Sequence, residues 1–238
     1  MKREFCRSEY QVRPRKPTEC PLLWSLALTA TLSIFLLLPS AIGSEVNWYA
    51  RAEYPNGDRY GVAGYNYVYN NYVISGYGIS EALAVYFYDY DWFAIGWNKD
   101  QAGGSAHFYA DWCFNNLPPP YLCMDYHYVD LGIATYGTSH SYKVSTSSIT
   151  SKTYKAFLDS VAKAQATFGY SYSKPAAASE AHDPRDSLTG HYWNLMHQIY
   201  IPQTGLQWYY WDAISTYADP PYYVTVISNR EFYTGGQG

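Results

Sequence analysis

Short aromatic runs, in which tyrosines tend to stand two residues apart, repeat along most of this chain. Tyr65, Tyr67 and Tyr69 give one such run. Successive side chains of a β-strand point to opposite faces, so a period of two indicates strands rather than helices. Gly, Pro, Asn and Ser separate the runs, and these residues favour turns. The pattern therefore predicts an all-β fold.

The order of the expected strands favours one architecture. No regular alternation of strands and helices is present, which argues against a parallel α/β fold. Short strands separated by turns predict an antiparallel β-sandwich or barrel. Pro55-Asn56-Gly57-Asp58 predicts a hairpin turn. The expected strands cover residues 47–51, 60–69, 83–90, 92–97, 106–114, 124–131, 140–145, 191–201, 206–211 and 222–232.

Residues 150–168 allow two interpretations. The apolar residues at 154, 157, 158, 161 and 164 fit helical spacing, and the segment is rich in good helix formers such as Lys, Ala and Gln. The alternative is a hairpin in which residues 154–158 and 161–168 flank a turn at Asp159-Ser160. The sandwich prediction holds with either one.

The first 43 residues have the order of a secretory signal. Basic residues in the first 20 positions precede an apolar run over residues 22–38, and Ala41 and Gly43 stand before Ser44. An uncleaved anchor is the alternative, because the apolar run approaches the ~20 residues that span a bilayer. We expect residues 44–238 to form a single domain that is secreted, or held at the outer face of the membrane by residues 1–43.

Two of the four cysteines lie after the expected signal, at Cys113 and Cys123. The three consecutive prolines between them require a loop, since proline has no backbone N–H. In an oxidising compartment, cysteines at the two ends of a short loop predict a disulfide. A metal site with the flanking Asp111, Asp125 and His127 is the alternative, although these residues match no recognised ligand spacing.

Residues 139–144 have the form His-x-Tyr-x-Val, and residues 154–159 give a following hairpin with an aspartate at its turn. This layout resembles that of concanavalin-like (jelly-roll) sandwich domains. Residues 178–182 and 190–193 resemble later strands of secreted prokaryotic sandwich proteins of unassigned function. The resemblance covers about residues 137–195 and favours the hairpin over the helix. Such hairpins usually have Asp-Gly, so Asp159-Ser160 leaves the turn type open.

Glu180 and His182 are the candidate catalytic residues. On a strand they would share a face, and a carboxylate beside an imidazole can take part in acid–base catalysis. The ordinary interpretation is a surface pair, because residues 183–186 read as an exposed turn. No Gly-x-Ser-x-Gly nucleophile motif occurs in the chain.

Two hydrolase mechanisms could use Glu180 with a partner. Glycosidases need two carboxyl groups facing the substrate, for which Glu53, Glu81 and Asp111 are further candidates. A glutamic-peptidase-like sandwich would need a glutamine, and Gln165, Gln198 and Gln207 are available. No motif selects among these residues.

Metal binding has weak support in the sequence. The spacings among His182, His191 and His197 do not indicate a zinc site. Asp89 and Asp91 would share a strand face and offer oxygen ligands that suit Ca²⁺, although acidic residues at a strand end are ordinarily solvated. No other cofactor is expected.

Aromatic rows provide the candidate ligand-binding surface. Tyrosine and tryptophan stack on the apolar faces of sugar rings and hydrogen-bond through their polar ends. The alternative is that tyrosines pair across strands and fill the sandwich. The expected ligand-binding residues are Tyr86, Tyr88, Tyr90, Trp193, Trp208 and Trp211.

These features predict a secreted protein that binds polysaccharide or cell-surface glycan. The alternatives are a secreted hydrolase that uses Glu180, and a structural or adhesive surface protein. The net charge of −4 gives no basic face for nucleic acid. A membrane contact is expected only through residues 1–43.

Overall fold

The computed structural model describes residues 47–74, 78–88, 90–101, 103–116 and 123–236, which belong to one compact unit. The expected signal at residues 1–43 lies outside these ranges. The described ranges contain no helix that is long and apolar enough to cross a membrane.

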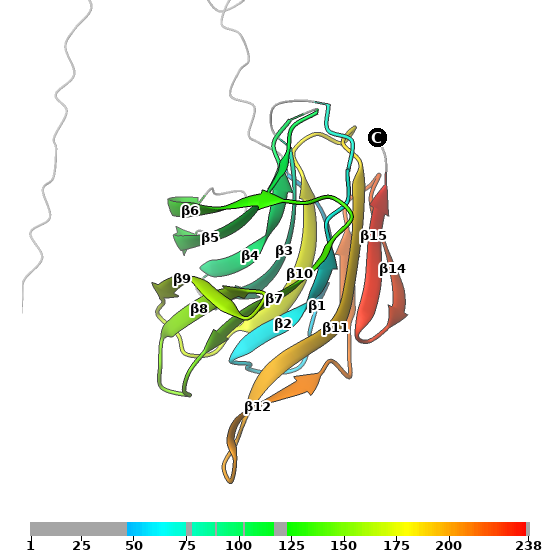
Figure 1. Ribbon diagram of the computed structural model, residues 1–238. Coiled ribbons are helices and arrows are strands. Elements are labelled where there is room, and N and C mark those ends of the chain that lie inside the picture. The colour runs from blue at the N-terminus through cyan, green and yellow to red at the C-terminus, as the bar shows by residue number, and fades with distance from the viewer. Residues whose placement is uncertain (1–46, 75–77, 89, 102, 117–122, 237–238) are drawn as a thin grey trace, which may run out of the picture. The chain divides into compact units, whose positions relative to one another are not determined.

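Two antiparallel sheets stack face to face (Figure 1). The first, called here the β10 sheet, has the order β13-β1-β10-β3-β4-β5-β6. Its strands are β1 (Trp48–Glu53), β3 (Ile79–Tyr86), β4 (Trp92–Lys99), β5 (Ala106–Asn116), β6 (Cys123–Ala134), β10 (Lys174–Ala181) and β13 (Ser215–Ala218).

The second, called here the β11 sheet, has the order β14-β15-β11-β2-β7-β8-β9, and β12 also pairs with β11. Its strands are β2 (Gly61–Tyr67), β7 (Ser139–Thr146), β8 (Thr153–Leu158), β9 (Val161–Thr167), β11 (Leu188–Ile201), β12 (Gly205–Tyr210), β14 (Tyr223–Ser228) and β15 (Glu231–Gly236). The predicted all-β antiparallel sandwich is confirmed.

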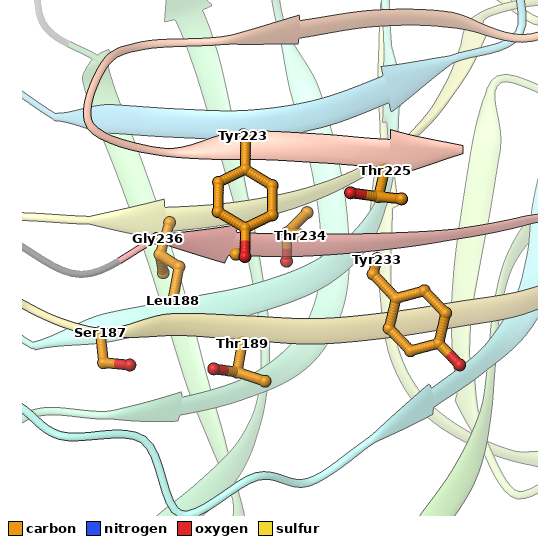
Figure 2. Close-up of a pocket in the computed structure, with 9 residues that line it drawn as sticks. Ser187, Leu188, Thr189, Tyr223, Thr225, Tyr233, Thr234 and Gly236 are labelled. Atoms are coloured by element: carbon orange, nitrogen blue, oxygen red, sulfur yellow. The ribbon is translucent and has the colours of Figure 1, made fainter. Parts of the chain in front are cut away.

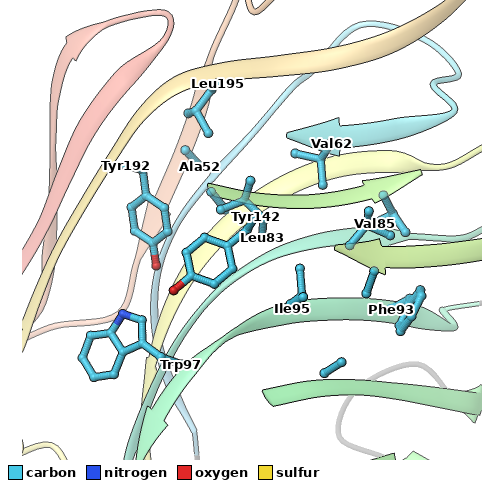
Figure 3. Close-up of a cluster of buried hydrophobic side chains, with 14 of the residues drawn as sticks. Ala52, Val62, Leu83, Val85, Phe93, Ile95, Trp97, Tyr142, Tyr192 and Leu195 are labelled. Atoms are coloured by element: carbon cyan, nitrogen blue, oxygen red, sulfur yellow. The ribbon is translucent and has the colours of Figure 1, made fainter. Parts of the chain in front are cut away.

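Alternate side chains of both sheets meet in the core between them. Figure 3 shows Tyr142 and Tyr192 of the β11 sheet pointing toward Trp97 of β4. All three side chains are buried. The Tyr192 hydroxyl donates a hydrogen bond of 2.7 Å to the carbonyl of Ala178, so its burial leaves no unpaired donor. Part of the tyrosine excess therefore fills the sandwich.

Residues 150–168 form the predicted hairpin of β8 and β9, and the alternative prediction of a helix is wrong. The spacing of 154 and 158 also fits a strand face, and both side chains are buried here with Ala156. Asp159 and Ser160 have φ values of 48° and 68°, the left-handed pair of a type I′ turn. The Asp159 carboxylate accepts hydrogen bonds from His140 Nδ1 at 2.7 Å and Ser141 N at 3.0 Å. These bonds hold the turn without the usual glycine.

The predicted disulfide between Cys113 and Cys123 is confirmed. It joins β5 to the first residue of β6, with the two Cα atoms 5.9 Å apart. These strands are hydrogen-bonded neighbours, so the bond ties the two strands together at the end of the hairpin where one strand leads into the next.

Candidate functional site

Glu180 points away from the sandwich core, on the outer face of the β10 sheet. Its neighbour Ser179 points inward, because the Ser179 hydroxyl lies 2.7 Å from Thr234 Oγ1 on the opposite sheet. Strand alternation then places Glu180 on the outer side. The same alternation places Asp111 of β5 there, since its neighbour Ala110 belongs to the core.

Tyrosines surround these two carboxyl groups. We call this region the carboxylate face and define it by six outward side chains. They are Tyr49, Tyr86, Tyr109, Asp111, Tyr126 and Glu180.

Small residues form the centre of the carboxylate face. Ala82, Ala84 and Ala94 are each less than 8% exposed, although they point outward. They pack with Tyr109 and with the partly buried Tyr86 and Trp92. Large rings thus cover a floor of small side chains, and this arrangement lowers the local exposure to water.

Asp111 is the most unusual group on this face. It is 8% exposed, and its Oδ2 accepts a hydrogen bond of 3.1 Å from the Tyr126 hydroxyl. Its Oδ1 is buried without a hydrogen-bond partner. Burial raises the pKa of Asp111 well above its usual range, the charge of Glu180 adds to this, and the Tyr126 hydrogen bond opposes it. Asp111 therefore keeps a proton at pH values where an ordinary aspartate has lost it.

Glu180 is more accessible, with a quarter of its side chain exposed. Its Oε1 accepts a hydrogen bond of 3.3 Å from the Tyr49 hydroxyl, and His182 Nε2 lies 3.7 Å from the same oxygen. Burial and the charge of Glu180 raise the pKa of Tyr49, so this phenol remains a donor. The expected proximity of Glu180 and His182 is present.

The two carboxyl groups act on the same tyrosines. Burial raises the pKa of Tyr86 to about 12, with Glu180 and Asp111 contributing in the same direction. Burial also raises the pKa of Tyr109, again with contributions from both carboxyl groups. The charge of Glu180 also raises the pKa of Asp111, and we therefore call Asp111 and Glu180 the coupled pair.

The other expected partners of Glu180 lie elsewhere. Gln165, Gln198 and Gln207 belong to β9, β11 and β12 of the opposite sheet, so the expected glutamic-peptidase pairing with one of them is wrong. The strands of the β10 sheet contain no glutamine in their described residues. Glu81 points into the core, where it is fully buried and accepts a hydrogen bond from Asn66 Nδ2 at 3.0 Å.

The expected aromatic surface does not exist as one face. Tyr86 belongs to the carboxylate face, but β3 ends there. Tyr88 and Tyr90 lie in the following loop, where Tyr90 has a φ of 67°. That left-handed residue turns the chain into β4, so the prediction that the three tyrosines share a strand face is wrong. The Tyr88 hydroxyl instead donates to Asp58 Oδ1 at 2.7 Å.

The expected tryptophans are also dispersed. Trp211 is 1% exposed and belongs to the core, so it cannot stack on a ligand and that prediction is wrong. Trp208 is partly buried on β12. Trp193 lies on the outer face of the β11 sheet.

Trp193 is part of a row of rings. Its ring lies 5.7 Å from the Tyr65 ring and 4.6 Å from the His191 ring, and His191 stacks on Tyr233 at 4.1 Å. Rings that face one another in a row cover each other's faces. Sugar stacking on Trp193 is therefore hindered by its own neighbours.

An open groove of about 530 Å³ begins at the end of this row. Figure 2 shows the rings of Tyr223 and Tyr233 with Thr189 and Thr225 beside them. The Tyr223 ring lies over Gly235, where a Cβ atom would come within 2.5 Å of it. Because Gly235 has no side chain, this ring lies against the strand, and Tyr223 is 56% exposed.

Metal ligands do not gather in the described ranges, which contain no group of three or more His, Cys, Asp or Glu side chains placed to hold an ion. Of the two aspartates expected to offer calcium ligands, Asp89 lies outside the described residues and Asp91 is buried. Calcium binding there stays a prediction.

Comparisons with known proteins identify the fold and no family. No protein-family model and no curated protein matches the sequence. Scytalido-glutamic peptidase, solved with a peptide-based transition-state analogue, has 11% identity and a TM-score of 0.53, covering 81% of this chain and 98% of that chain. SCP-B, a peptidase of the eqolisin family solved with the tripeptide Ala-Ile-His, has 11% identity and a TM-score of 0.52, with the same coverage.

A more distant likeness, with a TM-score of 0.36 and 10% identity, is to porphyranase B from Zobellia galactanivorans, covering 80% of this chain and 75% of that chain. The TM-scores of the two peptidase structures show a shared β-sandwich, consistent with the jelly-roll resemblance, and leave the activity to be argued from the site.

Proposed function

We propose that this protein is a secreted hydrolase that cleaves glycosidic bonds at the carboxylate face. Asp111 would act as the general acid and Glu180 as the second carboxylate. The observation that carries the proposal is the coupled pair itself, in which a buried carboxyl with a raised pKa faces the same tyrosines as a more accessible one. Glycoside hydrolysis needs this difference between two carboxyl groups.

Each group has a defined task in this reaction. Asp111 gives its proton to the glycosidic oxygen as the bond to the anomeric carbon breaks. Glu180, as its carboxylate, either takes a proton from the attacking water or attacks the anomeric carbon itself, in which case water then releases the sugar from the glycosyl-enzyme. The partly buried hydroxyl of Tyr49 supplies a hydrogen bond for a polyhydroxylated substrate, and the exposed part of the tyrosine rings supplies apolar contact area.

Access to Asp111 requires one side chain to move. Oδ1 is buried, and Tyr126 holds Oδ2. Tyr126 is 54% exposed and lies on β6, the edge strand of its sheet. Exposed side chains change rotamer within nanoseconds, so the substrate can displace this ring rapidly, with loss of its hydrogen bond to Asp111.

The test is the release of new reducing ends from a panel of neutral and acidic polysaccharides between pH 3 and 8. Glu180→Gln and Asp111→Asn should each lower the rate by about 100-fold or more, with unchanged circular dichroism. Glu231→Gln is the matched control, because Glu231 also lies beside a histidine, at 2.9 Å from His191, but on the opposite sheet. Turnover of peptides instead of glycans, or full activity of both variants, would refute the proposal.

A second candidate function is glycan binding without turnover, at the groove of Tyr223. The observation that favours it is the exposed Tyr223 ring over Gly235, which offers a flat face to a sugar. Retention on an insoluble polysaccharide that Tyr223→Ala abolishes, and Asp111→Asn leaves intact, would support it. Equal retention of Tyr223→Ala and the unaltered protein would exclude the groove.

A further inference from the structure

A second cavity, of about 400 Å³, lies where β12 pairs with β11, and its lining includes neither Glu180 nor Asp111. It gathers residues that are distant in sequence. Arg59 precedes β2, His197 belongs to β11, Tyr209 belongs to β12, and Arg230 lies in the turn between β14 and β15.

Both arginines of this cavity lack a carboxylate partner. In the described ranges Arg51 and Arg185 form ion pairs within 4 Å, whereas Arg59 and Arg230 form none. Arg59 Nη2 donates a hydrogen bond of 3.2 Å to the Tyr54 hydroxyl, and the Arg230 guanidinium lies 4.5 Å from the centre of the Tyr210 ring. Guanidinium groups that lack a carboxylate suit an anionic oxygen group.

His197 also lines this cavity. It is 4% exposed, and its ring lies 4.1 Å from the Tyr54 ring. Its Nδ1 is enclosed by protein, so His197 responds to an anion in the cavity through the charge of its ring and not through a hydrogen bond from Nδ1.

Burial and the neighbouring charges determine the protonation state of His197. Burial lowers the pKa of His197 to about 4, the positive charge of Arg59 acts in the same direction, and Asp212 opposes both. Asp212 is the one carboxylate in the cavity lining, and it already accepts the Tyr54 hydroxyl at 2.7 Å. Two guanidinium groups against one carboxylate leave the cavity positive.

One wall of the cavity is suited to a sugar ring. Tyr209 is 45% exposed. Within the described part of the chain no ring or cation stacks on it, in contrast to Tyr54 and Tyr210. A half-exposed phenol beside two guanidinium groups can cover the apolar face of a sugar while the arginines hold its charged substituent.

We propose that this cavity binds an anionic sugar, meaning a sugar ring that carries a carboxylate or a sulfate group. The arginines hold the anionic oxygens, Tyr209 contacts the ring, and the bound charge favours the protonated form of His197. This site is separate from the carboxylate face and does not depend on the hydrolysis proposed there.

The experiment is calorimetric titration of the intact protein with four small probes: glucuronate, glucose 6-sulfate, glucose and acetate. At least one of the two charged sugars should bind about tenfold or more tightly than both glucose and acetate. Arg230→Gln should weaken that binding about tenfold, and Tyr209→Ala should remove the preference over acetate. Arg185→Gln and Tyr72→Ala are the matched controls, because both residues are exposed and lie outside the cavity lining.

A nuclear magnetic resonance titration of His197 provides a second reading that does not depend on affinity. With the bound sugar the His197 midpoint should rise above its value in the sugar-free protein, because an anion favours the protonated ring. The proposal is overturned if glucose or acetate binds as tightly as both charged sugars, if none of the probes binds, or if Arg230→Gln behaves like Arg185→Gln. A His197 midpoint unchanged by the sugar would also overturn it.

Discussion

The Tyr126 hydroxyl donates a hydrogen bond of 3.1 Å to Oδ2 of Asp111. This bond favours the ionised carboxylate and thus opposes the effect of burial on the pKa of Asp111. The edge strand β6 therefore adjusts the proton affinity of a buried group on β5.

Tyr126→Phe removes that bond and keeps the ring. The pKa of Asp111 should rise further, because the larger of the two contributions that oppose burial and the charge of Glu180 is then removed. If protonated Asp111 is the general acid, the basic limb of kcat/KM against pH should move to higher pH. Tyr128→Phe, on the same strand, is the control. A basic limb that stays in place or moves down would contradict this role of Tyr126.

Glu81 makes the stability of the fold depend on pH. Burial raises the pKa of Glu81 well above its ordinary range in the folded protein. A carboxyl with a raised folded pKa contributes stability below its unfolded pKa, and this contribution is lost as the pH rises. The free energy of unfolding of Glu81→Gln, relative to the unaltered protein, should therefore increase from about pH 4.5 upward.

Urea denaturation at a series of pH values measures this difference. Glu53→Gln is the control, because Glu53 is a partly exposed carboxylate 3.2 Å from Arg51, and it should show no such increase. If the difference in the free energy of unfolding between Glu81→Gln and the unaltered protein is the same at every pH, the pKa of Glu81 is not raised by folding.

The turn between β8 and β9 can be stabilised at one position. Ser160 has a φ of 68°, which costs a residue with a side chain ~1 kcal/mol and costs glycine little. Ser160→Gly should therefore raise the free energy of unfolding by up to about 1 kcal/mol. Asp159→Gly, at a φ of 48°, should lower it instead, because the bonds to His140 and Ser141 are lost. Equal effects of the two changes in thermal unfolding would contradict this explanation.

The Cys113–Cys123 disulfide should contribute about 2–3 kcal/mol, because it limits the unfolded chain over a short loop. The double change Cys113→Ala and Cys123→Ala should lower the melting temperature under oxidising conditions. A reducing agent should lower the melting temperature of the unaltered protein and leave that of the double variant unchanged. Identical melting temperatures of both proteins without reductant would mean that the bond does not stabilise the fold.

Local patterns in the sequence predict the sandwich, the disulfide, the hairpin around Asp159 and the shared face of Glu180 and His182. Each depends on neighbours in the chain. The error at Tyr88 and Tyr90 has a local cause, because the left-handed Tyr90 ends the alternation. Trp211 shows a different limit, since alternation does not tell which of two faces is buried.

The importance of Asp111 could not be predicted from the sequence. Its raised pKa depends on burial among rings from several strands and on the charge of Glu180, which belongs to β10. The order of strands in the sheet determines which residues become neighbours of Asp111. The spacing of residues along the chain does not reveal that order.

The most direct test of the coupled pair is the pH titration of the Asp111 carboxyl carbon by nuclear magnetic resonance. We expect a midpoint above the ordinary aspartate value in the unaltered protein, and a lower midpoint in Glu180→Gln, because the charge of Glu180 then no longer adds to the effect of burial. A midpoint at or below the ordinary value, or one that Glu180→Gln leaves unchanged, would contradict this expectation.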